Sequence, residues 1–416
     1  MPRVLLVAAT TGYQTRAFAD AARQLGLDLA LATDRCHVLE DPWGDHAIPV
    51  RFDDPLASRD VLLAAGPFDA VVAVADRPTL VAALAAEALC IPYNSPASVA
   101  VCHDKYLARQ RFQAAGLPVP KFFRVPINAS PIDTAHRAPF PCVLKPLGLS
   151  ASRGVIRANN VAEFEEAFVR IRALLGSADV AMMREEQNRY IQVESFLDGR
   201  EFALEGLVTA GELQALAIFD KPDPLDGPFF EETIYVTPSR ESPATQQALA
   251  GSAGRAVRAL GLTHGPIHAE LRLQGGNVWV LEVAARPIGG LCARTLQFDG
   301  GVSLEELILR HALGEDVSHV RLSHSASGVM MIPIPNGGGI YRGVEGLQQA
   351  SAIADVEDVI ITAKEGQKIL PLPEGASYLG FIFARAGSPA RVEHALREAH
   401  ACLRFDIATV LPVMRR

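Results

Sequence analysis

Residues 267–290 read IHAELRLQGGNVWVLEVAARPIGG, and this stretch carries the most informative pattern of the chain. Two apolar runs flank the turn 274–277 (Gln-Gly-Gly-Asn), which predicts an antiparallel β-hairpin. One glutamate interrupts each run. Counting back from the turn places Glu270 opposite position 281, so within one residue of register Glu270 and Glu282 face one side of the sheet.

Two carboxylates inside apolar strands are unfavourable unless a cation neutralises them. Mg²⁺, which prefers oxygen ligands and bridges nucleotide phosphates, is the expected cation. The alternative is a pair of salt bridges, one of them to Arg272 or Arg286. Arg286 follows Glu282 by four residues, where a guanidinium could stabilise a transferring phosphoryl group. The backbone N–H groups of Gly289 and Gly290 could then bind a substrate carboxylate.

A second hairpin is expected at 140–158. Its first strand ends near Lys145, and its tip, the glycine-rich loop (residues 148–154), is built mostly of small residues. The backbone N–H groups of such a loop could close over phosphates while the lysine ammonium contacts them from the strand. Taken alone, a mobile hairpin tip with a solvated lysine explains the segment equally well.

Composition limits the possible functions. The 416 residues are 49% hydrophobic and 21% charged, which predicts a globular chain of about two to four domains. The net charge of −8, without a long basic run, argues against nucleic-acid or anionic-membrane binding and leaves small molecules as the expected partners. The cysteines lack C-x-x-C spacing, so neither a zinc site nor a disulfide framework is expected. The longest apolar stretch, 69–90, contains charged residues and cannot span a membrane, so we expect a cytoplasmic protein.

Between residues 3 and 95, short Val, Ala and Leu runs alternate with helix-period segments, which predicts βαβ units and a parallel sheet. The first strand-to-helix turn, Ala8 to Tyr13, lacks the three glycines of a dinucleotide-binding fingerprint, although Asp34 lies where an NAD-binding acid could stand. An NAD-dependent oxidoreductase is therefore the weakest interpretation. A helix over 104–115, followed by Gly and Pro stop signals, suits a domain boundary.

The remaining chain alternates between helices and strands. Residues 161–175 predict an amphipathic helix that packs on the second hairpin, with Asn160 and Glu163 as its capping box. Strands dominate from 190 to 236. Beyond about residue 320, a pattern that ends in a helix at 390–403 predicts a small α+β unit.

Taken in order, these motifs resemble the ATP-grasp superfamily, which includes biotin carboxylase, D-alanine–D-alanine ligase and the purine-pathway ligases. The resemblance covers roughly residues 1 to 300. It implies an α/β and α+β multidomain chain with the ATP-grasp fold. The expected parts are a Rossmann-like N-terminal domain at 1–98, a linker helix at 99–120, a small lid subdomain at 121–190, a large subdomain at 191–318 and a C-terminal α+β domain at 319–416.

The resemblance also implies a site for ATP with Mg²⁺, for which Mn²⁺ can substitute. The residues that would contact ATP are Lys105, Lys145, the glycine-rich loop with Gly148, Ser150, Ser152 and Gly154, the backbone of Glu194 and Leu197 at the adenine, and Glu201 at the ribose. Glu270 and Glu282 match the metal ligands, and Arg286 matches the catalytic arginine, acting with Lys145. The family often has Asn two residues after the second glutamate, whereas this chain has Ala284.

Substrate-binding residues are expected on both sides of this motif. The proline-rich segment 221–238 resembles a substrate-side loop, and its Glu231 and Glu232 are candidates for holding an ammonium group; a simple connector is the alternative. Arg294 is a candidate for a second carboxylate, alongside Arg286, Gly289 and Gly290. His268 is interpreted as a packed or solvent-facing residue and not as a base.

The Glu-x-Ala-Ala-Arg form followed by glycines is most similar to L-amino acid ligases of the bacilysin dipeptide ligase type and to carnosine-synthase-like enzymes. This resemblance implies a carbon–nitrogen ligase that joins a small-molecule carboxylate and an amine through an acyl phosphate, releases ADP and phosphate, and forms a homodimer. Two alternatives remain: an enzyme that activates bicarbonate or formate, and a catalytically silent nucleotide-binding regulatory module, for which Ala284 is the one hint.

Overall fold

The computed structural model describes residues 1–9, 14–34 and 46–409. Most of the turn from Ala8 to Tyr13, on which the dinucleotide fingerprint bears, lies outside the described residues. Within the described ranges, none of the helices combines the length and the apolar character that a membrane crossing requires.

The N-terminal residues form the parallel sheet that the alternating pattern predicts, with strand order β3-β2-β1-β4. Its strands are β1 (Arg3–Ala8), β2 (Asp28–Thr33), β3 (Ile48–Pro49) and β4 (Ala70–Val74). Its helices are α1 (Thr15–Gln24), α2 (Pro55–Ala65) and α3 (Pro78–Leu89). Every residue of β4 is buried, as expected for a parallel strand covered on both faces.

Two helices lead from this sheet into the next unit, α4 (Pro96–Cys102) and α5 (Lys105–Ala114). Helix α5 begins at its N-cap, Asp104, whose carboxylate accepts hydrogen bonds from the backbone N–H groups of Tyr106 and Leu107. The cap therefore fixes where Lys105 leaves the chain.

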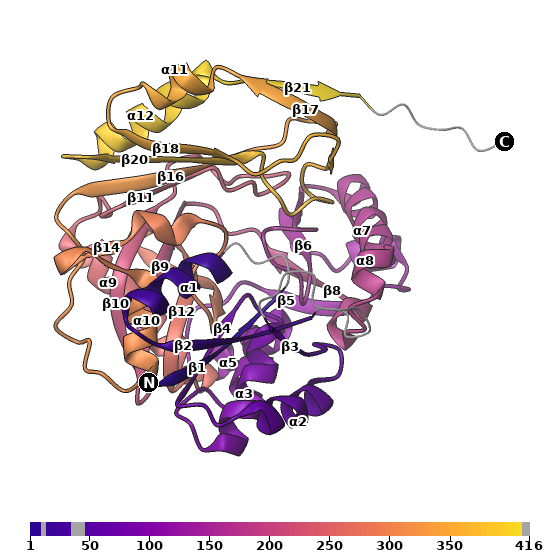
Figure 1. The fold of residues 1–416 in the computed structure, drawn as a ribbon. Helices are drawn as coiled ribbons and strands as arrows, with labels where there is room; N and C mark the ends of the chain where they lie inside the picture. The colour runs from indigo at the N-terminus through magenta and orange to yellow at the C-terminus, as the bar shows by residue number, and fades with distance from the viewer. Residues whose placement is uncertain (10–13, 35–45, 410–416) are drawn as a thin grey trace.

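The lid, at the right of Figure 1, is a four-stranded sheet of order β5-β8-β6-β7 backed by a helix. Its elements are β5 (Phe122–Pro126), α6 (Pro131–Ala135), β6 (Cys142–Pro146), β7 (Ile156–Ala158), α7 (Val161–Leu175), α8 (Ala178–Ala181), η1 (Glu186–Arg189) and β8 (Tyr190–Ser195). The capping-box prediction for α7 is confirmed, because Asn160 Oδ1 accepts from the Glu163 backbone N–H.

The largest sheet has eight strands in the order β13-β12-β9-β10-β11-β16-β20-β18. Its strands are β9 (Arg200–Thr209), β10 (Glu212–Asp220), β11 (Ile234–Thr237), β12 (His264–Gln274), β13 (Asn277–Ala284), β16 (Ala326–Ile332), β18 (Val356–Ile361) and β20 (Gly380–Ala386). Since β11 pairs with β16, this sheet runs across the position, near 318, where a domain boundary is expected.

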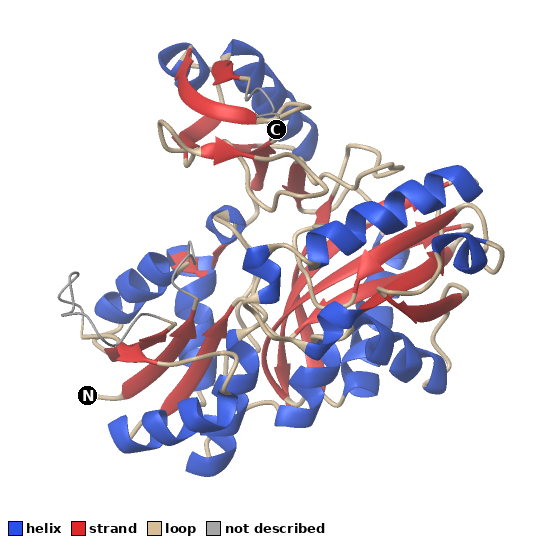
Figure 2. Ribbon diagram, turned by 90° about the vertical axis from the view of Figure 1, so that its right-hand side faces the viewer, coloured by secondary structure: helices blue, strands red, loops and turns tan. Residues whose placement is uncertain are grey.

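The remaining elements pack around this sheet. They are α9 (Pro243–Leu260), η2 (Cys292–Thr295), β14 (Gln297–Phe298), η3 (Asp299–Gly301), β15 (Val302–Ser303), α10 (Leu304–Ala312), β17 (Gly339–Glu345), α11 (Leu347–Ser351), β19 (Lys368–Ile369), α12 (Pro389–Cys402) and β21 (Arg404–Ala408). Strands β19, β17 and β21 form a separate three-stranded sheet. Figure 2 shows this C-terminal unit at the top, above the N-terminal sheet and the lid.

One apolar core joins the N-terminal sheet to the large sheet. It contains Val4 and Leu6 of β1, Leu207 of β9 and Leu307 of α10, all buried. Helix α10 contacts α1 and β4 on one side and β12 on the other. Burial of this continuous apolar surface holds the carboxyl end of β4 close to the carboxyl end of β13, where the functional residues meet.

A stacked histidine pair, of which His311 is buried, predicts a dependence of stability on pH. His264 and His311 stack with ring centroids 4.3 Å apart, and His311 Nε2 hydrogen-bonds to Thr209 Oγ1. Burial lowers the pKa of both, and His264 helps to bring the pKa of His311 to about 4. The ordinary pKa of histidine is 6.5, so below this pH the unfolded state binds more protons than the folded state does. The free energy of unfolding should therefore fall as the pH is lowered from 6.5 to about 4.

We expect this pair to remove about 1–2 kcal/mol of stability over that range. Urea unfolding midpoints measured across the range test it, with His311→Gln as the comparison. The variant should show a shallower loss of stability on acidification, since it lacks a group that is neutral when folded and charged when unfolded. Parallel pH slopes for the two proteins would contradict the assignment.

Candidate active site

A cavity lies between the lid and the large sheet. Most of the predicted nucleotide and metal residues line it: Lys105, Lys145, Ser150, Ser152, Glu194, Leu197, Glu201, Glu270, Glu282 and Arg286. Gly148 and Gly154 stand at the two ends of the glycine-rich loop that covers it. The fold thus brings together residues that are spread over more than 180 positions of the chain.

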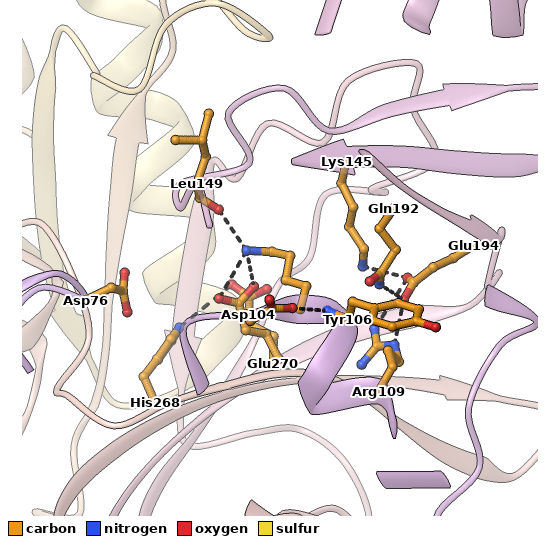
Figure 3. Close-up of polar contacts among 12 residues, drawn as sticks. Asp76, Asp104, Tyr106, Arg109, Lys145, Leu149, Gln192, Glu194, His268 and Glu270 are labelled. Atoms are coloured by element: carbon orange, nitrogen blue, oxygen red, sulfur yellow. Dashed lines mark hydrogen bonds and ion pairs between the residues drawn. The ribbon is translucent and has the colours of Figure 1, made fainter. Parts of the chain in front are cut away.

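The carboxylate of Glu194 is the centre of a buried ionic network at the lid end of this cavity. Lys145 Nζ lies 2.5 Å from Glu194 Oε2, and Arg109 Nε donates to Oε1 at 2.6 Å (Figure 3). Gln192 Nε2 also donates to Oε1 at 2.6 Å. Burial raises the pKa of Glu194, but Arg109 and Lys145 outweigh it and hold the pKa at about 2. Glu194 is therefore a carboxylate that positions the Lys145 ammonium.

Arg109 is a structural member of this network that the sequence did not reveal. Its side chain is almost completely buried, and its Nη1 donates to the Val280 carbonyl at 3.0 Å. Replacement by Met would leave Glu194 buried with one cation fewer. We expect Arg109→Met to destabilise the fold by about 3–5 kcal/mol, measured by urea unfolding. A loss below 1 kcal/mol would show that Lys145 and Gln192 suffice.

Lys105 links α5 to both the glycine-rich loop and the metal-site candidate. Its Nζ donates to the Leu149 carbonyl at 2.7 Å and lies 3.2 Å from Glu282 Oε2. Its backbone N–H donates to the Leu147 carbonyl. The ammonium is thus held at the mouth of the loop, where a phosphate oxygen could replace the carbonyl partner.

Glu270 and Glu282 are paired directly across β12 and β13. Counting from the turn predicted position 281, and the difference arises because the register shifts between Glu270 and Leu271, which pairs with Val280. This β-bulge brings Glu282 onto the same face as Glu270, and both line the cavity. In the part of the chain that the structure describes, neither Arg272 nor Arg286 forms an ion pair with them.

Lys221 neutralises a second group of carboxylates. Its Nζ lies 2.8 Å from Glu201 Oε1 and 3.5 Å from Glu270 Oε1, and it also pairs with Glu232. Ligand atoms of the three glutamates lie within 4.8 Å of one another. Because the ammonium lies among them, it offsets part of the negative charge of this group. The signal in the sequence for Lys221 is the scarcity of lysine: the chain has six lysines, and three of them, Lys221 included, reach this site.

Arg272 fixes the far end of the cavity. Its Nε donates to Glu201 Oε2 at 2.9 Å, its Nη1 donates to the Leu197 carbonyl, and its Nη2 donates to the Leu225 carbonyl at 2.5 Å. These contacts hold the segment after β8 against β12. Glu201, which is predicted to bind the ribose, therefore pairs with Arg272 through one carboxylate oxygen and with Lys221 through the other.

Arg286 connects β13 to the N-terminal sheet. Its Nε and Nη2 donate to the two carboxylate oxygens of Asp76, at 3.0 and 3.3 Å, and its Nη1 donates to the Pro287 carbonyl. Asp76 follows β4, 210 positions earlier in the chain. Burial raises the pKa of Asp76, but Arg286 outweighs it and holds the pKa at about 2. The bidentate pair fixes the guanidinium plane toward the cavity.

His268 is buried, in agreement with its interpretation as a packed residue, and it also lines the cavity. Its Nδ1 pairs with Glu205, whose other oxygen accepts from the Ile288 backbone N–H at 3.0 Å. Its Nε2 lies 3.8 Å from Glu270 Oε1 (Figure 3). Burial lowers the pKa of His268, and Glu205 reverses this and raises it to about 9.

A second cavity adjoins the first. The two share Ser150, Ala151, His268, Glu270 and Arg286. The walls of the second cavity are mostly apolar and come from three parts of the chain, with Val74, Tyr235, Ile288, Met331, Tyr378 and Phe381 among them. Glu232, Gly289 and Gly290 also line it.

Two predicted substrate residues lie outside both cavities. Arg294 pairs with Asp358 at 3.0 Å and covers the Phe383 ring at 4.5 Å from its centroid. Glu231 lies against the backbone of Ile334, and burial raises its pKa. The neighbouring Glu232, in contrast, lines the second cavity.

The comparisons with known proteins agree with this geometry. Residues 138–295 match the family model described as ATP-grasp domain, and residues 307–408 match the model described as L-amino acid ligase C-terminal domain 2. The structure superposes on that of an L-amino acid ligase from Bacillus licheniformis with a TM-score of 0.83 and 28% identity, covering 98% of this chain and 99% of that one. Residues 138–295 thus form an ATP-grasp domain, and the chain has the ATP-grasp fold. The predicted fold class is thereby confirmed.

Two curated relatives match over a smaller share of their length. An uncharacterized protein of Sinorhizobium fredii (strain NBRC 101917 / NGR234) is 27% identical over 319 residues, which is 76% of this chain and 64% of that protein. Dapdiamide A synthase of Enterobacter agglomerans is 28% identical over 157 residues, which is 38% of this chain and 35% of the synthase. The chain thus spans less than two thirds of the length of either relative.

The donor set of this ATP-grasp protein fits a Mg²⁺ ion. Glu270 and Glu282 offer hard carboxylate oxygens from opposed positions, and each side chain is about one quarter exposed, at 27% and 26%. Ala284 lines the cavity but has no oxygen in its side chain, so water would have to complete the coordination shell. Lys105 and Lys145, which line the cavity, fit the phosphates of a nucleotide.

Proposed function

We propose that this chain is an ATP-dependent carboxylate–amine ligase that joins amino acids, or an amino acid and a small carboxylic acid, through an acyl phosphate. One observation carries the proposal: a cavity lined by lysines and paired carboxylates opens into a second, largely apolar cavity, and they meet at Arg286 and Glu270. The match of residues 307–408 to the C-terminal domain of L-amino acid ligases supports the same reading.

In this proposal the first cavity holds ATP. Lys105 and Lys145 bind phosphate oxygens, and the glycine-rich loop covers them from the lid side. The backbone around Glu194 and Leu197 contacts the adenine, and Glu201 accepts hydrogen bonds from the ribose. Mg²⁺ held by Glu270 and Glu282 would supply charge neutralisation at the phosphates.

The second cavity holds the substrates. The backbone N–H groups after Arg286, at Gly289 and Gly290, bind the substrate carboxylate, and Glu232 holds an ammonium group. The carboxylate oxygen attacks the γ-phosphorus, and the bond from that phosphorus to the ADP oxygen breaks. Arg286 spreads the charge that develops on the transferred group. The amine then attacks the acyl carbon, loses a proton and displaces phosphate, which leaves the amide.

The walls of the second cavity favour this reaction over activation of bicarbonate or formate. Those acids have one carbon atom and no apolar part, whereas this cavity presents the rings of Tyr235, Tyr378 and Phe381. Apolar walls favour a ligand with an apolar side chain. A second ATP-grasp activity on a one-carbon acid therefore has less support from the site.

The proposal is tested by ADP and phosphate release with Mg²⁺·ATP against single amino acids, pairs of amino acids and bicarbonate, with mass spectrometry of the products. Turnover that requires a pair and yields a dipeptide mass is the expected result. Turnover with bicarbonate alone would support the one-carbon alternative. Binding of Mg²⁺·ADP without turnover in any combination would support the regulatory module.

A further inference from the structure

A segment of the C-terminal unit connects the second cavity to the lid. We call residues 371–378, between β19 and β20, the strap. At one end, Ala376, Ser377 and Tyr378 form part of the wall of the second cavity. At the other end, Pro373 and Glu374 contact the lid.

The contacts between the strap and the lid converge on the glycine-rich loop. The Gly154 backbone N–H donates to the Pro373 carbonyl at 2.9 Å, and Arg153 Nε donates to the Glu374 carbonyl at 2.8 Å. Arg170 of α7 donates two hydrogen bonds to the Glu374 carboxylate, at 2.5 and 2.9 Å. The end of the loop is thus held by a residue more than 200 positions away.

The strap makes a tight turn between its two ends. The Gly375 backbone N–H donates to the Pro371 carbonyl, and a Cβ at Gly375 would lie 1.8 Å from the Leu370 carbonyl oxygen. The chain is therefore folded tightly back at this point. Tyr378 packs edge-on against Phe381 of β20, with ring centroids 6.2 Å apart. A side chain placed in the second cavity would contact this aromatic end.

The other end of the glycine-rich loop is exposed to both ligands. Ser150 and Ala151 line both cavities, so they face the nucleotide on one side and the substrate on the other. Ala151 and Ser152 adopt left-handed backbone conformations, with φ of 54° and 53°, which L residues adopt only when neighbouring contacts hold them. The contacts of the strap are among those that hold this loop in the observed conformation.

We propose that Glu374 is a positioning residue, and that the strap couples occupancy of the second cavity to closure of the glycine-rich loop over the nucleotide. The inference rests on the proposed function. A substrate against Tyr378 steadies the strap, and the strap steadies the loop through Pro373 and Glu374. By thermodynamic linkage, the substrate then tightens nucleotide binding. A glycine-rich loop that the strap does not hold would admit water to the acyl phosphate.

The test compares Glu374→Gln and Gly375→Ala with the unaltered chain. The dissociation constant of a non-hydrolysable ATP analogue is measured by calorimetry, with and without the amino acid that supports turnover. In the unaltered chain we expect that amino acid to tighten binding of the analogue about three- to fivefold, a modest effect because the Arg170–Glu374 pair is partly exposed. In Glu374→Gln, which lacks this pair, the amino acid should have no effect on analogue binding. The ratio of ADP released to amide formed should rise above one in both variants.

A charge exchange and a matched control sharpen the test. Arg170→Glu combined with Glu374→Arg should restore the effect of the amino acid on analogue binding, since the pair is re-formed with reversed signs. Glu357→Gln removes a comparable surface pair, in which Arg385 Nε lies 2.7 Å from Glu357 Oε1 on β18, away from the strap. It should leave binding and the product ratio unchanged.

Limited trypsin digestion tests, without any substrate, whether Glu374 holds the glycine-rich loop. The bond after Arg153 should be cut faster in Glu374→Gln than in the unaltered chain, as mapped by mass spectrometry. An unchanged cleavage rate, or an unchanged effect of the amino acid on analogue binding, would overturn the proposal. Faster cleavage in Glu374→Gln, in a protein for which no amino acid supports turnover, would confirm that the strap holds the loop. It would also reject the coupling to substrate and count separately against the proposed function.

Discussion

Glu282→Gln should lower the rate of ADP formation by about 10²–10³-fold with saturating substrates. The substitution keeps the shape of the side chain but removes one of the two opposed carboxylates on β12 and β13. Lys105, which lies 3.2 Å from Glu282, loses its ionic partner as well. The fold should survive because Glu282 is partly exposed and belongs to none of the apolar clusters.

Metal binding gives an independent readout of the same variant. Electron paramagnetic resonance of Mn²⁺ with ADP should show weaker metal binding in Glu282→Gln, since one charged oxygen ligand has been replaced by an amide. Glu212→Gln is the matched control, because Glu212 is an exposed residue of β10 that pairs with Arg258. Full activity together with unaltered Mn²⁺ affinity in Glu282→Gln would rule out Glu282 as a metal ligand.

Arg286→Lys should lower kcat by about 10²–10³-fold while changing the KM for ATP little. Lysine keeps the positive charge but cannot form the bidentate pair with Asp76, and it cannot present two donors to the transferred phosphoryl group. The loss should therefore fall on the chemical step. Steady-state kinetics and single-turnover measurements of ADP formation check this expectation.

Asp76→Asn separates positioning from direct action. If Arg286 contacts the reacting group and Asp76 only orients it, the Asn variant should lose about tenfold in kcat, less than Arg286→Lys. Equal losses would mean that the orientation of the guanidinium is the whole effect. A KM for ATP raised in proportion, with kcat unchanged, would assign Arg286 to nucleotide binding and contradict its proposed role.

Much of the local structure could be read from the sequence. The capping box at Asn160 and the helical spacing of Phe164 and Phe168 define α7 within one stretch of chain. The Gln-Gly-Gly-Asn turn defines the hairpin that carries Glu270 and Glu282. Such features follow from backbone hydrogen bonding and side-chain periodicity over a few residues, so neighbours in sequence suffice to specify them.

The register of that hairpin was harder to predict. A bulge of one residue in β13 decides that Glu282, and not Leu281, stands opposite Glu270. Bulges are stabilised by packing on both faces of a sheet, which the turn sequence alone does not determine. The direction of Arg294 has a similar origin, because Asp358 and Phe383, which hold it away from the cavities, belong to the C-terminal unit.

The sequence by itself determined helix α7, the hairpin of β12 and β13, the parallel N-terminal sheet and the order of the charged motifs. The tertiary structure alone decided the partners: Asp76 for Arg286, Arg109 for Glu194, and Lys221 for three glutamates. The physical reason is that a buried charge takes whichever opposite charge the packing of sheets and helices brings within reach. That packing depends on apolar surfaces distributed over the whole chain, and spacing along the sequence does not record it.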